Sequence, residues 1–317
     1  MKAVVTAGAT DGIPVVADRP DPTPGVGEVL VRVRAAGLNN ADLIQVRGGY
    51  PAPPGSPPDI PGLELAGEVV AIGPNASRFR VGDRVMAVVG GGGQAELAVV
   101  HERAAMPVPD ELSWEEAGGF PEVFTTAHDA LFTQAGLGPG ERVCVHGAAG
   151  GVGTAGVQLA AAVGARVVAT VRRESLRADV AGLGTGITVV APEDFEALGP
   201  FDVILELIGA PNLAGDVASL ATRGRITVIG IGGGAKAELN LAALMAARGT
   251  ISSSTLRTRP LEAKADAARR VEAHVLPLVS GGRVRVPVQA TYALADGAAA
   301  YRRFAEGAKL GKIVLVT

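Results

Sequence analysis

The spacing of hydrophobic and polar positions changes near residue 120. Before that point, short β-prone runs alternate with Gly- and Pro-rich turns, and this pattern predicts strands at 29–34, 68–72, 84–89 and 96–100. Short strands at this spacing are typical of a compact β-barrel or sandwich. The proline-rich segment Tyr50–Pro61 is expected to form an ordered surface loop, because proline removes backbone donors.

From about residue 121 to 260 the pattern alternates between strands and helices. Strands are predicted at 142–146, 166–171, 187–190, 201–208, 225–230 and 250–254. Helices are predicted at 152–163, 174–183, 212–221 and 239–247. Repeated β–α alternation predicts a parallel sheet with helices on both faces.

The last segment has helical patterns at 261–279 and 294–306 around a strand at 284–290, and a final strand at 312–316. It resembles the first region more than the second, so we expect it to return there. This organisation predicts one domain from 1–121 and 265–317, and a second domain from 122–264.

A glycine-rich turn, Gly147–Gly153, joins the strand at 142–146 to an Ala-rich helix. Strand, glycine turn, helix and strand in this order are the context of a dinucleotide-binding motif. Gly150 would let the backbone approach a pyrophosphate, and Gly153 would let the helix pack closely on the strand. Free N–H groups at the helix start would favour the phosphates. Ala148 stands where the motif has its first glycine, and a purely structural turn is the alternative.

The residues after the second strand of this unit indicate which dinucleotide binds. That strand ends at Val171 without an acidic residue and is followed by Arg172, Arg173 and Arg177. An acid there would bond the ribose hydroxyls of NAD, whereas guanidinium groups can bind a 2′-phosphate. The pattern therefore predicts NADPH. Glu174 argues against NADPH, and the alternative is that the three arginines form the solvated start of an ordinary helix.

Composition excludes several classes of function. The 317 residues carry a net charge of −3, with 48% hydrophobic and 19% charged residues. The chain therefore lacks the excess of basic residues that would predict binding to nucleic acid or to a membrane surface. No apolar run has transmembrane length, and the N-terminal residues lack the apolar core of a signal peptide. The single cysteine, Cys144, permits no intrachain disulfide. A cytoplasmic protein is expected, with His128 and His146 in structural roles.

Several segments together resemble one known family from end to end. They are GLNNADLIQVRGGYP (37–51), PGLELAGEVVAIG (61–73), PEVFTTAHDAL (121–131), LRTRPLEAKA (256–265) and GKIVL (311–315). The chain resembles the zinc-free quinone oxidoreductases of the medium-chain dehydrogenase/reductase superfamily, in particular the NADPH-dependent subgroup induced by a tumour suppressor. The resemblance implies an α/β fold, in which a Rossmann doubly wound parallel sheet accompanies a GroES-like β-barrel catalytic domain, and a homodimer.

The resemblance also implies a set of site residues. Asn39 and Thr126 would line the nicotinamide side of the cofactor site, and Tyr50 with Asn39 would serve catalysis. The remaining cofactor-binding positions are Ala149, Gly150, Gly151, Val152, Gly209, Gly230, Leu256 and Lys312, besides the three arginines. Each of three residues has a structural alternative: Asn39 could form a turn, Thr126 could cap a helix, and Tyr50 could be a packing aromatic.

No metal is expected at this site. Zinc-dependent members of the superfamily carry a cysteine where this chain has Asn39 and a histidine where it has Leu63. Asp42 and Glu64 remain, but a catalytic zinc site needs nitrogen or sulfur ligands.

Without a Lewis acid, a simple ketone is a poor hydride acceptor, whereas a quinone or an α,β-unsaturated carbonyl delocalises the charge it receives. The resulting hypothesis is an NADPH-dependent, zinc-independent reductase of quinones or related enones. An enoyl-thioester reductase and a crystallin-like NADPH-binding structural protein are the alternatives. The β-prone edge at Ile251–Leu256 is the expected homodimer contact, unless the chain itself covers that edge.

Overall fold

The structure is a computed structural model that describes residues 1–317. Its contacts divide the chain into two compact units. Unit 1 comprises Met1–Glu122, Leu256–Ser280 and Val286–Thr317, and unit 2 comprises Val123–Thr255 and Gly281–Arg285.

Unit 1 is built on a seven-stranded sheet with the order β14-β15-β3-β4-β5-β7, in which β6 also pairs with β3. Its strands are β3 Glu28–Gly37, β4 Glu64–Ile72, β5 Arg84–Val88, β6 Leu97–His101, β7 Ala105–Pro107, β14 Val288–Ala293 and β15 Lys312–Val316. An antiparallel hairpin, β1 Lys2–Thr10 and β2 Ile13–Asp18, forms a separate small sheet.

The sheet of unit 1 forms because alternate residues of its strands are apolar. Val29, Val31 and Val33 of β3 are fully buried and pack with Leu65 and Val69 of β4. A one-residue slip would turn this row toward solvent, so the burial pattern fixes the register, in which Val31 lies opposite Val69.

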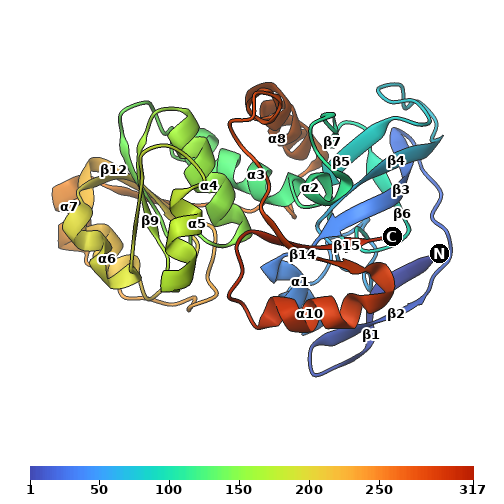
Figure 1. Ribbon diagram of the computed structural model, residues 1–317, viewed down its shortest axis with the longest axis horizontal. Coiled ribbons are helices and arrows are strands. Elements are labelled where there is room, and N and C mark those ends of the chain that lie inside the picture. The colour runs from blue at the N-terminus through green and yellow to red at the C-terminus, as the bar shows by residue number, and fades with distance from the viewer. The chain divides into compact units, whose positions relative to one another are not determined.

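Helices complete unit 1: α1 Asn40–Val46, α2 Trp114–Gly118, α8 Leu261–His274, α9 Leu276–Ser280 and α10 Gly297–Ala305, while α3 Pro121–His128 begins there. Figure 1 shows α10 lying along the β1–β2 hairpin. Ala300, Tyr301 and Phe304 share one face of α10, because residues three and four apart lie on the same side of a helix, and they are buried with Val4.

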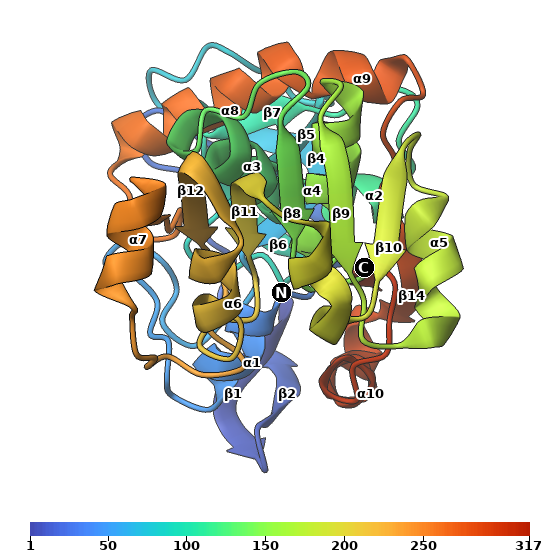
Figure 2. The ribbon, with the colours of Figure 1, turned by 90° about the vertical axis from the view of Figure 1, so that its left-hand side faces the viewer.

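Unit 2 is a six-stranded parallel sheet with the order β10-β9-β8-β11-β12-β13. Its strands are β8 Arg142–Val145, β9 Arg166–Thr170, β10 Ile187–Val190, β11 Phe201–Glu206, β12 Leu220–Val228 and β13 Thr250–Ser253. Figure 2 shows β12, β11, β8, β9 and β10 side by side in this order.

The helices of unit 2 are α4 Gly151–Ala162, α5 Arg177–Ala181, α6 Leu213–Ala218 and α7 Leu241–Ala247. In Figure 1, α4 and α5 lie on one face of the sheet and α6 and α7 on the other. The turns of 3-10 helix are Glu174–Leu176, Pro192–Leu198 and, in unit 1, Leu294–Asp296, and a π-helix covers Asp129–Gln134. Because both faces are covered, Val143, Cys144 and Val145 of β8 are all buried. The predicted parallel sheet with helices on both faces is confirmed.

Several predicted elements have different bounds in the structure. The strand expected at 225–230 begins at Leu220, within the helix expected at 212–221, which ends at Ala218. The strand expected at 284–290 is β14, Val288–Ala293, which begins after Pro287 because proline donates no ladder hydrogen bond. The helix expected at 261–279 is interrupted between α8 and α9, next to Pro277. The helix expected at 174–183 starts as a 3-10 turn.

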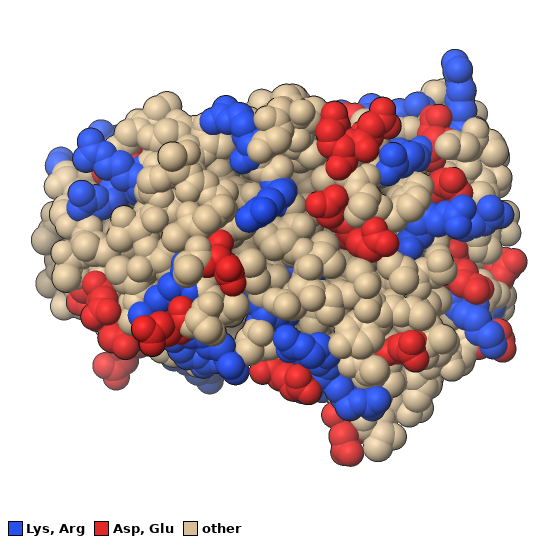
Figure 3. Space-filling view, viewed as in Figure 1, with Lys and Arg blue, Asp and Glu red and all other residues tan.

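The chain also returns to unit 1 earlier than the predicted residue 265. Leu256–Lys264 belong with unit 1, because Arg257 is hydrogen-bonded to Gly90 and Tyr50 of that unit. None of the helices is both long and apolar enough to cross a membrane. On the face drawn in Figure 3, basic and acidic side chains are interspersed.

Candidate active site

The glycine turn of unit 2 lies between the end of β8 and the start of α4. Gly147 adopts a φ of 62°, in the left-handed region that favours glycine. A Cβ atom at Gly153 would lie 2.5 Å from the Gly147 carbonyl oxygen, so a side chain there would push the helix off the turn. The predicted close packing at Gly153 is thus present in the structure.

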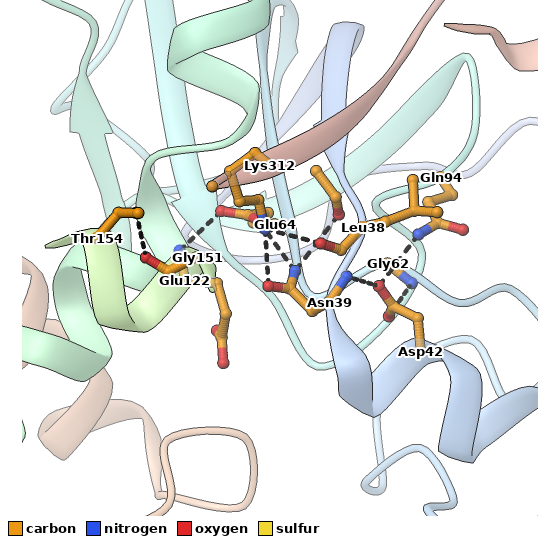
Figure 4. Close-up of polar contacts among 12 residues, drawn as sticks. Leu38, Asn39, Asp42, Gly62, Glu64, Gln94, Glu122, Gly151, Thr154 and Lys312 are labelled. Atoms are coloured by element: carbon orange, nitrogen blue, oxygen red, sulfur yellow. Dashed lines mark hydrogen bonds and ion pairs between the residues drawn. The ribbon is translucent and has the colours of Figure 1, made fainter. Parts of the chain in front are cut away.

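The first turn of α4 offers backbone donors. Gly150 is its N-cap, and the Thr154 N–H makes the first helical hydrogen bond, 2.8 Å to the Gly150 carbonyl. The preceding N–H groups, from Gly151 to Gly153, have no partner within the helix. The Thr154 hydroxyl donates to the Gly151 carbonyl (Figure 4). A helix start with free N–H groups fits the pyrophosphate of a dinucleotide.

The three arginines after β9 differ in their freedom. Arg172 and Arg173 are exposed, as is Glu174. The Nε of Arg177 donates to the Val171 carbonyl at 3.1 Å, which tethers that guanidinium to the end of the strand. Arg172 and Arg173 are therefore the side chains available to an added phosphate.

Gly209 and Gly230 lie beyond the carboxyl ends of β11 and β12, where ligands of doubly wound sheets bind. A Cβ atom at Gly230 would lie 2.1 Å from the Leu207 carbonyl oxygen. The two loops therefore pack backbone against backbone. These two predicted cofactor positions lie at the same edge of the sheet as the glycine turn, because β8, β11 and β12 are parallel.

His146, directly before the glycine turn, is the centre of a buried polar network. Its Nε2 lies 2.8 Å from Oδ1 of Asp216, and its Nδ1 lies 3.1 Å from the Thr170 hydroxyl. Glu206 accepts hydrogen bonds from the N–H of Gly209 at 2.7 Å and from the Asn212 side chain at 3.0 Å. Burial is the largest single influence and disfavours the charged imidazole, but the hydrogen bonds and charges of Asp216 and Cys144 together outweigh it and raise the pKa of His146.

This network supports the structural role expected of His146. Single ligand atoms of His146, Glu206 and Asp216 lie within 4.8 Å of one another, a spacing that a metal could bridge. However, the 2.8 Å separation from Asp216 is that of a direct hydrogen bond, and Glu206 already accepts from backbone and side-chain donors. Glu206 and Asp216 come from β11 and α6, and no sequence motif pointed to either of them.

In unit 1, the predicted cofactor residue Lys312 lies in a buried cluster (Figure 4). Its Nζ lies 2.6 Å from Oε1 of Glu64, 2.8 Å from Oδ1 of Asn39 and 2.8 Å from the Leu38 carbonyl. The side chains of Lys312 and Glu64 are only 2% and 0% exposed. All three ammonium protons therefore have acceptors inside unit 1, and a cofactor contact by this group would have to replace one of them.

Asn39 is held from several sides. Its Nδ2 donates to Oε1 of Glu64 at 2.9 Å, and its backbone N–H donates to Oδ2 of Asp42 at 2.8 Å. Asp42 also accepts from the Gly62 N–H at 3.1 Å and from Gln94 at 3.2 Å. Burial raises the pKa of Asp42 to about 6. The network fixes the segment around Leu63 beside Asn39.

The cluster does not fit a catalytic zinc. Leu63 is a buried aliphatic residue, and Asn39 is occupied at both ends of its amide by Glu64 and Lys312. The other oxygen of Glu64 accepts the backbone N–H of Glu122 at 2.8 Å. The donor set therefore contains no imidazole or thiolate, and a lysine ammonium already balances the acid.

Tyr50 is positioned by an arginine that sequence reasoning did not single out. The Cζ of Arg257 lies 4.5 Å from the centre of the Tyr50 ring, and its guanidinium donates to the Tyr50 carbonyl at 2.9 Å. It also donates to the Gly90 carbonyl at 2.8 Å and to the Gln45 side chain at 2.5 Å. Arg257 thus fixes the tyrosine, the glycine run and α1 together. Its segment, LRTRPLE, was visible in the sequence, but these partners are distant along the chain.

Two other predicted positions are buried. Thr126 lies in the middle of α3 rather than at its start, and Leu256 lies where the chain re-enters unit 1. Their contact with a cofactor stays a prediction. Glu122, in the first turn of α3, was not singled out from the sequence although it belongs to the PEVFTTA segment.

Comparisons with known proteins match both parts of the fold. Residues 25–110 match the alcohol dehydrogenase GroES-like domain, and residues 185–315 match the family described as zinc-binding dehydrogenase. The chain is 30% identical to the quinone oxidoreductase of Mus musculus, over 93% of this chain and 91% of that protein.

A second relative is much longer. Over 91% of this chain, the sequence is 36% identical to a phenolphthiocerol/phthiocerol polyketide synthase protein of Mycobacterium tuberculosis, and the chain spans only 13% of that synthase protein. Among solved structures, a mycobacterial protein in complex with NADPH superposes with a TM-score of 0.87 at 26% identity, over 100% of both chains. The GroES-like and Rossmann parts of the predicted fold are thus confirmed, and the chain belongs to the medium-chain dehydrogenase/reductase superfamily of oxidoreductases.

Proposed function

We propose that this protein is an NADPH-dependent, zinc-independent reductase of quinones or related α,β-unsaturated carbonyls. The observation that carries the proposal is the buried cluster around Lys312. Where a zinc enzyme needs nitrogen and sulfur ligands, this chain has Asn39, Leu63 and an acid that is already paired with an ammonium group. Electrophilic help from a metal is therefore not part of the proposed reaction.

The cofactor proposal rests on unit 2. The free N–H groups at the start of α4 suit the pyrophosphate, and the exposed Arg172 and Arg173 suit a 2′-phosphate. The structural relative in complex with NADPH supports the same choice. When bound, the reduced nicotinamide supplies a hydride.

The residues of unit 1 would bind and orient the acceptor. The Tyr50 ring is held by Arg257, so its hydroxyl can hydrogen-bond an acceptor oxygen without a large loss of side-chain freedom. A quinone or enone suits such a site, because the charge it receives is delocalised and one hydrogen bond suffices to stabilise it.

Enoyl-thioester reduction is the second candidate, and the 36% identity to a polyketide synthase segment favours it specifically. It would use the same cofactor and the same delocalised acceptor chemistry. The two candidates differ in the group attached to the carbonyl.

The test is NADPH oxidation measured with ortho- and para-quinones, simple enones and enoyl thioesters, each with a heat-inactivated control. We expect turnover with quinones or enones. Turnover that is fast only with enoyl thioesters would favour the second candidate, enoyl-thioester reduction. NADPH binding without turnover of any acceptor would contradict reductase activity and favour a crystallin-like role.

A further inference from the structure

The carboxyl end of the unit 2 sheet holds a buried imidazole that contacts three neighbouring segments. His146 directly follows β8, and its Nδ1 lies 3.1 Å from the hydroxyl of Thr170, the last residue of β9. Its Nε2 lies 2.8 Å from Oδ1 of Asp216 on α6 and 3.9 Å from Oε2 of Glu206, the last residue of β11. All four residues are at most 2% exposed, so they interact with one another rather than with bulk water.

The partners of this imidazole also bind the backbone of the loops at the ends of the strands. The hydroxyl of Thr170 accepts the Gly147 N–H of the glycine turn at 3.3 Å. Glu206 accepts the N–H groups of Ile208 and Gly209 in the loop after β11. One imidazole therefore connects the glycine turn to the end of β9 and, through the acid, to the loop that contains Gly209.

The glycine turn and the loop after β11 also lie in direct contact. A Cβ atom at Gly147 would lie 2.9 Å from Cδ1 of Ile208, so the two segments approach more closely than a side chain would allow. Gly147 and Gly209 have φ angles of 62° and 105°, both in the region that favours glycine. Because glycine has no side chain and adopts a wide range of φ and ψ, each loop depends on other residues to hold one conformation.

Two carboxyl groups buried beside one imidazole are not an effective way to stabilise a core. Burial raises the pKa of Asp216 to about 6, against the opposing effect of the hydrogen bond from His146. The attraction within a buried pair often only offsets the cost of removing its charges from water, and apolar residues of similar volume can stabilise a protein equally well. A buried polar network favours instead one arrangement of the groups that it connects.

We propose that His146 is a positioning residue that holds the glycine turn, the end of β9 and the loop after β11 in the arrangement that binds the dinucleotide. The inference rests on the proposed function, because these segments form its proposed cofactor site, and it adds the group that orders them. Since His146 is fully buried, it acts through its partners. The free N–H groups of α4 follow the glycine turn, and Arg172 and Arg173 follow the end of β9, so a shift of either segment would displace phosphate donors.

The test replaces the polar pair by an apolar pair, His146→Leu with Asp216→Val, and measures the dissociation constant of NADPH by fluorescence without an acceptor. We expect a urea midpoint close to that of wild type, because apolar residues of similar volume take the place of the buried pair. The dissociation constant should rise about 10-fold, which corresponds to loops that occupy the binding arrangement about one tenth of the time.

The matched control replaces another ion pair of unit 2, Arg225→Met with Glu141→Leu. The Nη1 of Arg225 lies 2.7 Å from Oε1 of Glu141, which directly precedes β8 and so lies at the opposite end of that strand from His146. This control should leave the dissociation constant of NADPH unchanged, because it removes a charged pair without touching the loops at the carboxyl end.

Single variants separate the hydrogen bonds from the bulk of the side chains. Asp216→Asn keeps an oxygen that can accept from Nε2 of His146, so it should retain most of the affinity for NADPH that Asp216→Val loses. Thr170→Val removes, at nearly constant volume, the hydroxyl shared by His146 and Gly147, and it should weaken NADPH binding even if the double variant does not fold. A merely structural role would lower the urea midpoint of these variants without this order of affinities.

A second readout needs no dinucleotide. In protein without cofactor, the amide hydrogens of Gly147, Ile208 and Gly209 should exchange with solvent faster in the double variant than in wild type, while those within β8 and β11 stay protected. NADPH affinity that is equal in wild type, the double variant and Thr170→Val would overturn the proposal, and so would unchanged exchange at these three amides. If wild type bound no dinucleotide, the proposed function would fail, and the exchange rates would still decide whether His146 orders the loops.

Discussion

At the scale of single residues, Tyr50 is the proposed contact to the acceptor oxygen. We expect Tyr50→Phe to lower the turnover number about 10- to 100-fold, because one hydrogen bond to developing charge is lost. The Michaelis constant for NADPH should change little. Steady-state kinetics decide this, with Tyr292→Phe in β14 as control. Unchanged turnover would assign Tyr50 to packing.

Lys312 is expected to matter for stability because its partner is buried. Lys312→Met would leave the carboxylate of Glu64 without its cation, and breaking a buried pair in this way costs on the order of 3–5 kcal/mol. Urea unfolding followed by circular dichroism measures the change. Lys2→Met, which removes an exposed pair with Asp18, is the control and should have little effect. If both variants unfold at the wild-type midpoint, the cluster is not a stabilising element.

We propose that the two exposed arginines after β9 determine the choice of cofactor. Replacing Arg172 and Arg173 with Ala should raise the Michaelis constant for NADPH by on the order of 10–100-fold for each charged hydrogen bond lost, and leave that for NADH almost unchanged. Arg166→Ala, at the other end of the same strand, is the matched control. A wild type that prefers NADH, or an equal effect on both cofactors, would refute the assignment.

At the scale of elements, β13 forms one edge of the parallel sheet in unit 2. Large apolar side chains near that end of the unit are exposed: Leu241 is 64% exposed and Met245 is 76% exposed, both on α7, which packs on β12. A terminal strand that pairs on one side only, beside exposed apolar residues, favours pairing with a second copy of the chain. We therefore propose a homodimer through this edge.

Light scattering at micromolar concentration tests the dimer. Wild type should have twice the mass of the chain, and Met245→Glu should shift the population toward monomer, because a charge would be buried in the contact. Val81→Glu, at an exposed position of unit 1, should leave the mass unchanged. A monomeric wild type would contradict the proposal.

The elements predicted from the sequence hold best where one local pattern determines them. The strands at 187–190 and 312–316 have the predicted bounds, because each is an apolar run, rich in β-branched residues, that follows a glycine with a positive φ, Gly186 or Gly311. The β1–β2 hairpin and α1 were not predicted. The bounds failed at Pro277 and Pro287, where a single proline interrupts an apolar pattern that otherwise continues.

The candidate site was predictable only in part. The glycine turn is local, so its conformation follows from the sequence around it. The partners of Lys312 come from β4 and from the segment before α1, and those of Arg257 come from α1, the Tyr50 loop and the glycine run. Pairings over such separations depend on the folded sheet, which no local pattern specifies. The same holds for Asp216 and His146 in unit 2.

At the scale of the whole molecule, the proposed chemistry needs both units: one to bind the dinucleotide and one to bind the acceptor without a metal. The family description of residues 185–315 mentions zinc, whereas the donor set around Asn39 and Leu63 does not fit it. Metal independence is therefore the central claim.

The most direct measurement is the rate of NADPH oxidation with a quinone by protein whose zinc content has been determined by elemental analysis, before and after treatment with a strong chelator. We expect far less than one zinc per chain and an unchanged rate after chelation. One zinc per chain, or activity that is lost with the chelator and restored by zinc, would contradict it.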